Sequence, residues 1–100
     1  MTAFMIATTT INSENPHSLQ VYVEGTLPLI EAAGGRLVSR YGHKETVFGS
    51  AGSEFVVIVE YPSGEAIRKL FQSTAYKQLI PARDKAFSAY DVSIYEVLYP

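Results

Sequence analysis

The segment Phe55–Tyr61 constrains the fold most, because six of its seven residues are apolar and they do not alternate with polar ones. Successive side chains of a strand point to opposite faces of a sheet, so this run is typical of a strand buried on both faces. Helices packed on one side would leave the other face of such a sheet wet. Since a chain of 100 residues supplies only one further layer, we expect a second copy to cover that face.

The first third of the chain predicts a strand followed by a helix. Ala3–Ile11 is rich in β-branched residues and has no helical periodicity, which favours a strand. Asn15 and Pro16 provide an N-cap and a first-turn proline, and Gly34-Gly35 ends the helix. Pro28 lies inside it and predicts a bend near Glu24–Pro28. The apolar residues of the helix recur at spacings of three and four: Leu19, Val23, Leu27 and Ile30.

The middle of the chain predicts two extended segments before the buried strand. Arg36–Tyr41 and Lys44–Gly49 both look extended, and Gly42-His43 between them reads as a hairpin turn or a bulged bend. Ser50–Ser53 is expected to be a loop. These segments fit one strand or two paired strands that precede Phe55–Tyr61.

The last third predicts helices and a closing strand. Ser63 caps a short helix, and Ser73 or Thr74 caps the next one, which Pro81 allows to bend. Asp91–Tyr99 alternates cleanly and predicts the last strand. The second helix is expected to carry one stripe of side chains: Tyr76, Leu79 or Ile80, Arg83 and Phe87.

The resulting order is strand, helix, two strands, helices, strand, which is the βαββαβ order of a ferredoxin-like α+β fold with a four-stranded antiparallel sheet. We expect one domain over residues 1–100 that works as a homodimer through its sheet faces. The net charge is −2 and the eight lysines and arginines are scattered, so no nucleic-acid partner is expected.

The composition also narrows the chemistry and the location. The chain has no cysteine and two histidines, so neither a disulfide nor a three-histidine or Cys/His zinc site can form within it. It has no nucleotide-binding or nucleophile-elbow motif, and we expect neither a metal nor a cofactor. Met1–Ile11 lacks a basic start and suits a strand better than a signal peptide, and no run of about 20 apolar residues exists. We expect a cytoplasmic protein with no membrane partner.

Several blocks of the sequence are distinctive in their order and spacing: Pro28-Leu29-Ile30 before Gly34-Gly35-Arg36, then Val56–Ser63, Ser73-Thr74-Ala75-Tyr76 and Arg83. These blocks resemble the DUF1330 family of the dimeric α+β barrel superfamily. The resemblance runs over about Tyr22–Leu98 and implies a ferredoxin-like protomer whose sheet packs against the sheet of a partner to form a barrel. The superfamily includes cofactor-free monooxygenases and muconolactone isomerase, whereas the family itself has no agreed activity.

Arg83 is the strongest candidate for substrate binding, because its helical stripe also carries Tyr76 and is otherwise apolar. A guanidinium there could hold a carboxylate or an enolate of a ligand. The competing interpretation is an internal ion pair with Glu60, since buried charges are usually paired within a protein. We place Arg83, Tyr76 and Glu60 in the candidate substrate site under the first interpretation. Arg40 joins them, because it shares a strand face with Arg36 and could attract an anion or line a solvated edge.

Tyr22 and His43 are the candidate catalytic residues. The Tyr22 phenol could hydrogen-bond a ligand, or it could pack on the core with its hydroxyl in water. His43 could act as a general base or acid near neutral pH, or it could be a solvated turn residue. Four other tyrosines are interpreted as sheet and interface aromatics: Tyr61, Tyr90, Tyr95 and Tyr99.

These residues are compatible with three functions. The first is a cofactor-independent enzyme acting on a small organic acid or on a phenolic or polyketide-like compound. The second is a dimer that binds a small metabolite without converting it, and the third is an accessory dimer whose interior is filled by side chains. A buried His43 in a pocket would favour the enzyme, a solvent-exposed His43 would favour binding, and a packed interior would favour the accessory dimer.

Overall fold

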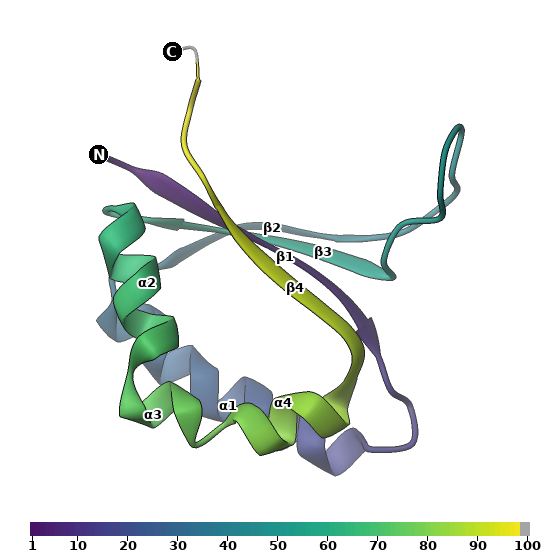
Figure 1. Ribbon diagram of the computed structural model, residues 1–100, viewed down its shortest axis with the longest axis horizontal. Helices are drawn as coiled ribbons and strands as arrows, with labels where there is room; N and C mark the ends of the chain where they lie inside the picture. The colour runs from purple at the N-terminus through teal and green to yellow at the C-terminus, as the bar shows by residue number, and fades with distance from the viewer. Residues whose placement is uncertain (99–100) are drawn as a thin grey trace.

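A computed structural model describes residues 1–98 and contains one antiparallel sheet with helices packed on it (Figure 1). The strands lie in the order β2-β3-β1-β4, so the first and third strands of the chain are central. This confirms the α+β class and the four-stranded antiparallel sheet. The elements are β1 (Ala3–Ile11), α1 (Pro16–Ala32), β2 (Arg36–Gly42), β3 (Phe55–Tyr61), α2 (Gly64–Gln72), α3 (Thr74–Lys77), α4 (Ile80–Ala86) and β4 (Phe87–Tyr95).

The helices in Figure 1 lie on one face of the sheet only, which we call the covered face. On β1, Met5 and Ala7 point to this face and are almost fully buried, whereas Phe4 and Ile6 point to the other side and are half-buried. We call that second side the open face. The strand register extends it over the neighbouring strands, because side chains of paired residues share a face: its apolar members include Phe4, Ile6, Val56, Ile58 and Tyr95.

The first helix begins after the predicted N-cap residue Asn15 and at the predicted proline, but the Asn15 side chain makes no capping hydrogen bond. Pro16 occupies the first turn of α1, and the Asn15 side chain donates to the carbonyl of Lys85 instead of capping the helix. The helix runs through Pro28 and ends at Ala32, two residues before Gly34, whose φ of 82° is the left-handed conformation that glycine adopts readily. The Asn15 contact therefore ties the start of α1 to the end of α4.

The predicted helix after Ser73 is divided into α3 and α4. Ser63 caps α2 as predicted by accepting from the amide of Ala66, and Ser73 Oγ accepts from the amide of Tyr76 at 3.1 Å. Pro81 lies in the first turn of α4 rather than inside a long helix, and Phe87 is the first residue of β4. The strand predicted from Asp91 thus starts four residues earlier, and its predicted end at Tyr99 lies outside the described residues.

Residues 43–54 form a loop, so the extended segment predicted for Lys44–Gly49 is wrong. The amide of His43 donates to the carbonyl of Glu54 and closes the base of the loop. Figure 1 shows this loop projecting from the end of the sheet, away from the helices. Val47 and Phe48 near its tip are more than 90% exposed. Within residues 1–98, the helices are too short or too polar to span a membrane.

Candidate functional site

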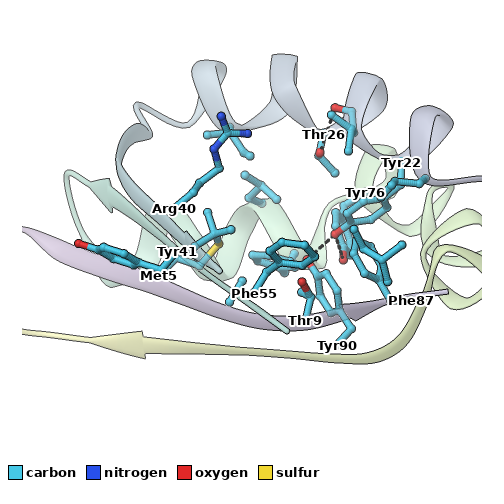
Figure 2. Close-up of a pocket in the computed structure, with 18 of the residues that line it drawn as sticks. Met5, Thr9, Tyr22, Thr26, Arg40, Tyr41, Phe55, Tyr76, Phe87 and Tyr90 are labelled. Carbon is cyan, nitrogen blue, oxygen red and sulfur yellow. Dashed lines mark hydrogen bonds between the residues drawn. The ribbon is translucent and has the colours of Figure 1, made fainter. Parts of the chain in front are cut away.

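A pocket of about 510 Å³ lies between the covered face and the helices (Figure 2). Its floor comes from alternate residues of the two central strands, and α1 supplies one wall through residues three to four positions apart. The floor includes Met5, Ala7, Thr9, Phe55 and Val57, and the α1 wall includes Leu19, Tyr22, Val23, Thr26 and Ile30. The interior is thus mainly apolar, and it is not filled by side chains.

Three tyrosine hydroxyls meet at one end of this pocket, and we call them the tyrosine cluster. The oxygen of Tyr22 lies 2.8 Å from that of Tyr76 and 2.5 Å from that of Tyr90. The rings stand edge to face around Tyr22, with centroids 6.1 Å and 5.7 Å away, which holds the hydroxyls together. The helix α1, the short helix α3 and the strand β4 each contribute one member.

The tyrosine cluster gathers hydroxyl donors and acceptors at one end of the pocket. Each hydroxyl has one hydrogen, so the cluster has three, and the two bonds between the hydroxyls use two of them. The Nη1 of Arg83 donates to the Tyr76 oxygen at 3.2 Å, which uses an acceptor and no further hydroxyl hydrogen. Whichever direction these two bonds run, they leave one hydroxyl hydrogen of the cluster unused.

The hydroxyls of Tyr22 and Tyr90 are donors rather than bases at ordinary pH. Burial raises the pKa of Tyr22 far above its usual value, and the neighbouring Tyr90 and Tyr76 raise it further. Burial also raises the pKa of Tyr90. Burial opposes the charge of Arg83, but its bonds to Tyr76 and Asp84 prevail, so its pKa is raised and it stays a cation.

Arg83 reaches the tyrosine cluster from outside the main pocket. Its guanidinium carbon lies 5.5 Å from the ring centroid of Tyr90 and 6.0 Å from that of Tyr76. It lines a second, more polar hollow of about 460 Å³ and pairs with Asp84 at 3.3 Å. Arg83 therefore stabilises the tyrosine cluster through Tyr76 without lining the main pocket.

The predicted internal pair between Arg83 and Glu60 is wrong. Glu60 forms its ion pair with Arg36. The register explains the difference, because Glu60 pairs with Phe4 and both residues point to the open face. The helix that carries Arg83 packs on the covered face, so the sheet separates the two side chains.

Arg40 lies on the covered face, and the prediction that it shares a face with Arg36 is wrong. The register of β2 shifts between Leu37 and Ser39, so Arg36 pairs with Glu60 whereas Arg40 pairs with Val57. The extra residue of a β-bulge turns the following side chains to the other face. Arg40 consequently lines the pocket, and Figure 2 shows it at the end opposite Tyr22 and Tyr76.

His43 lies outside the residues that line the pocket. It is exposed in the loop after β2, and its Nε2 is 2.9 Å from Thr46 Oγ1. The structure thus brings together Tyr22, Tyr76 and Arg83 from the predicted site and leaves His43 and Glu60 apart from them. Within residues 1–98, His, Asp and Glu form no group of three that could hold a metal ion.

The sequence interpretation missed the role of Tyr90, which it assigned to the sheet and its interface. Tyr90 pairs with Thr9 and points to the covered face, where its hydroxyl reaches Tyr22. Tyr90 alternates with Val92, and this pattern indicates a strand that includes Tyr90. The predicted strand nevertheless begins only at Asp91, because the sequence interpretation places Phe87 in the preceding helix. Tyr61 is a buried core residue as predicted for a sheet aromatic, and Tyr99 lies outside the described residues.

Comparisons with known proteins agree with this fold. A family model described as a domain of unknown function, DUF1330, matches residues 2–98. No curated protein matches the chain. A protein of unknown function from Rhodopseudomonas palustris is 18% identical with a TM-score of 0.81, and the match covers 99% of this chain and 84% of that one.

Two further solved structures carry informative descriptions at lower identity. SnoaB from Streptomyces nogalater, a cofactor-independent oxygenase, is 11% identical with a TM-score of 0.66, and the match covers 99% of this chain and 95% of that one. A dimeric ferredoxin-like protein of unknown function from Thermobifida fusca is 11% identical with a TM-score of 0.58, over 97% of this chain and 92% of that one. At these identities the likeness concerns the fold.

Proposed function

The chain belongs to the DUF1330 family of unknown function, and from its pocket we propose that it binds a small, mainly apolar organic acid or phenolic compound. The ligand places a carbonyl, carboxyl or phenol oxygen against the tyrosine cluster. One observation carries the proposal: a cluster of three tyrosine hydroxyls, each able to act as a donor, stands at the end of an apolar pocket. Such a donor orients a ligand whose remaining contacts are non-directional.

The size and state of the pocket favour a ligand over an accessory role. A volume of about 510 Å³ falls within the range of small-molecule sites, roughly 300–1,000 Å³. A protein whose interior only supports its fold would be expected to fill such a space with side chains. The open pocket therefore argues against the accessory dimer.

Conversion of the bound compound without a cofactor is the second candidate function. The tyrosine cluster, with the cation of Arg83 behind Tyr76, could stabilise negative charge that develops on a ligand oxygen. The fold of the oxygenase SnoaB supports this candidate by analogy. Binding ranks first because His43, the predicted proton acceptor, is exposed outside the pocket. The role of Tyr22 in both candidates is to donate a hydrogen bond.

We also propose that the protein is a homodimer in which a second copy covers the open face. Phe4, Ile6 and Ile58 on this face are only half-buried in one chain, and Tyr95 is 52% exposed. An apolar sheet face of this kind is a typical interaction surface. The dimeric Thermobifida fusca protein shares the fold, which supports this arrangement. Cytoplasmic location stays a prediction from the cysteine-free sequence.

Displacement of a neutral dye tests the binding proposal. Nile red is expected to fluoresce in the pocket and to be displaced by phenols and small acids. Tyr22→Phe removes one hydroxyl of the tyrosine cluster and is expected to weaken phenol binding by about tenfold, the value of one hydrogen bond. Tyr95→Phe is the matched control, because it removes a hydroxyl from the open face. Equal phenol affinity in both variants would refute the proposal.

The two candidate functions are separated by following the bound compound itself. Compounds that displace Nile red are incubated with the protein in air and analysed by mass spectrometry. A new product that forms with wild type and is lost with Tyr22→Phe would favour the enzyme over the binding protein. Compounds that bind and are recovered unchanged would support binding alone.

A further inference from the structure

The pocket has a second polar end, formed by Arg40 at the end opposite the tyrosine cluster (Figure 2). Arg40 is the only charged residue among those that line the pocket in the described part of the chain. Between the two ends, the lining consists mainly of apolar side chains such as Ala7, Phe55 and Val57. A ligand that fills the pocket therefore meets hydrogen-bond donors at both ends and an apolar surface between them.

Arg40 points into the pocket because of the bulge in β2. Regular alternation from Arg36 would leave Arg40 on the open face, since residues four apart on a strand share a face. The register shift between Leu37 and Ser39 instead pairs Arg40 with Val57, which belongs to the pocket floor. Bulges commonly redirect a side chain next to a functional site. The local backbone thus delivers a cation to an otherwise apolar cavity.

Arg40 also differs from the other arginines in that it forms no ion pair within residues 1–98. The chain has four arginines, and three of them form ion pairs: Arg36 with Glu60, Arg68 with Glu65 and Arg83 with Asp84. No carboxylate of residues 1–98 lies within ion-pair distance of Arg40. The planar guanidinium fork is suited to bind a carboxylate through two parallel hydrogen bonds. An anionic group of a ligand would supply the partner that the chain does not.

We propose that the ligand is a bifunctional acid, with a carboxylate bound by Arg40 and a carbonyl or phenol oxygen bound by the tyrosine cluster. Its body between these groups is flat or apolar and contacts the pocket floor. This inference rests on the proposed binding function and narrows it from any small acid or phenol to oxo-acids and hydroxy-acids of this shape. It assigns Arg40 the role of selecting acids over their neutral esters.

Two matched series of compounds test the inference. The first contains 4-hydroxycinnamate, its methyl ester and cinnamate, and the second contains 6-hydroxy-2-naphthoate, its methyl ester and 2-naphthoate, so that the body varies in length. Displacement of Nile red gives the affinity of each compound for wild type and for two variants. Arg40→Gln removes the proposed carboxylate partner, and Arg68→Gln is the control because Arg68 is exposed and does not line the pocket.

Wild type is expected to bind at least one hydroxy-acid roughly tenfold more tightly than its ester, since hydrogen bonds to charged groups are strong. This preference decreases as salt is added, because Arg40 is exposed to solvent although it lines the pocket. Arg40→Gln abolishes the preference without changing the affinity for the ester, and Arg68→Gln retains it.

The outcomes separate this inference from the function on which it rests. Esters and acids that bind equally well to wild type, or an acid preference that survives in Arg40→Gln, would overturn the bifunctional ligand while leaving pocket binding intact. Failure of Nile red and of every compound in both series to bind would overturn the binding function itself. Loss of ester binding in Arg40→Gln would show that the variant had damaged the pocket, and Arg40→Lys, which keeps the charge, must then restore ester binding and the acid preference or the inference fails.

Discussion

The covered and open faces are built from the same four strands but are buried by different means. On the covered face, Met5 and Val59 are about 5% exposed and contact helices of the same chain. On the open face, the adjacent residues Phe4 and Ile58 are equally apolar but only half-buried. The apolar run of β3 therefore contributes side chains to both faces, and helices of the same chain bury only the covered face.

The difference also separates the protein's two expected kinds of binding. The covered face combines buried contacts with a pocket that has polar groups at both ends, which suits a small molecule. The open face lacks any covering element in residues 1–98, which suits a second sheet of the same kind. Single substitutions on neighbouring residues of one strand should therefore have different consequences.

The largest effect is expected from Val59→Asp on the covered face. Val59 is 4% exposed in the middle of a central strand, so the substitution buries a carboxylate among apolar side chains. Several kcal/mol of lost stability is expected, a large share of the roughly 5–15 kcal/mol of a typical domain. Circular dichroism should show loss of cooperative unfolding. A variant that unfolds like wild type would show that this face is not the core.

The next largest effect is expected from Ile58→Asp, one residue away on the open face. The side chain of Ile58 faces Ile6 on the neighbouring strand and away from the helices, so the fold should survive. A carboxylate placed in a sheet-to-sheet interface should weaken dimerisation by more than tenfold. Sedimentation velocity of both proteins measures this change. A monomeric wild type, or a variant that dimerises as well as wild type, would contradict the proposed interface.

A moderate loss of stability is expected from Tyr76→Phe in the tyrosine cluster. The lost hydroxyl bonds to Tyr22 and accepts from Arg83, so about 1–3 kcal/mol should be lost on urea unfolding. Tyr95→Phe removes an exposed hydroxyl from the open face and should change stability by no more than about 0.5 kcal/mol. Equal effects of the two substitutions would remove the distinction between a bonded cluster and a free surface hydroxyl.

The buried phenol of Tyr61 on the covered face is expected to change the stability of the fold only in alkaline solution. Burial raises the pKa of Tyr61 to about 12, against about 10 for an unfolded tyrosine. The folded state thus favours the neutral phenol, so its contribution is complete below pH 10 and is lost as the pH rises towards 12. Thermal unfolding between pH 8 and 12 should show this decline. It should be shallower in Tyr61→Phe, and an unchanged slope would contradict the assignment.

Local signals in the sequence were sufficient for most of the fold. The β-branched residues and the lack of helical periodicity predicted β1 with its observed bounds, and Pro16 and Gly34 marked the two ends of α1. The segment Lys44–Gly49 failed because Thr46, Val47 and Phe48 suit a strand although no neighbouring strand pairs with them. Strand propensity reports a compatible surface and not the presence of a partner.

The site was less predictable, because it depends on which face each strand residue occupies. The bulge in β2 moved Arg40 away from the face of Arg36, and the register of β3 placed Glu60 where Arg83 cannot reach it. A one-residue shift reverses the face of every following side chain, and no local pattern in the sequence announces it. Tyr76 and Arg83 are in contact as their shared stripe suggested, although they lie on two short helices, α3 and α4, and not on the one helix that was predicted.

The smallest effect is expected from Glu60→Gln on the open face. The side chain of Arg36, its partner, is 78% exposed, so in an isolated protomer solvent screens the pair and the midpoint of thermal unfolding should not change measurably. The Ile58→Asp variant provides this isolated protomer for comparison. A clear loss of stability in the wild-type dimer that disappears in the Ile58→Asp background would mean that the partner's sheet buries the ion pair. An equal loss in both backgrounds would mean instead that the open face stabilises the protomer on its own, and the contrast between the two faces would no longer hold.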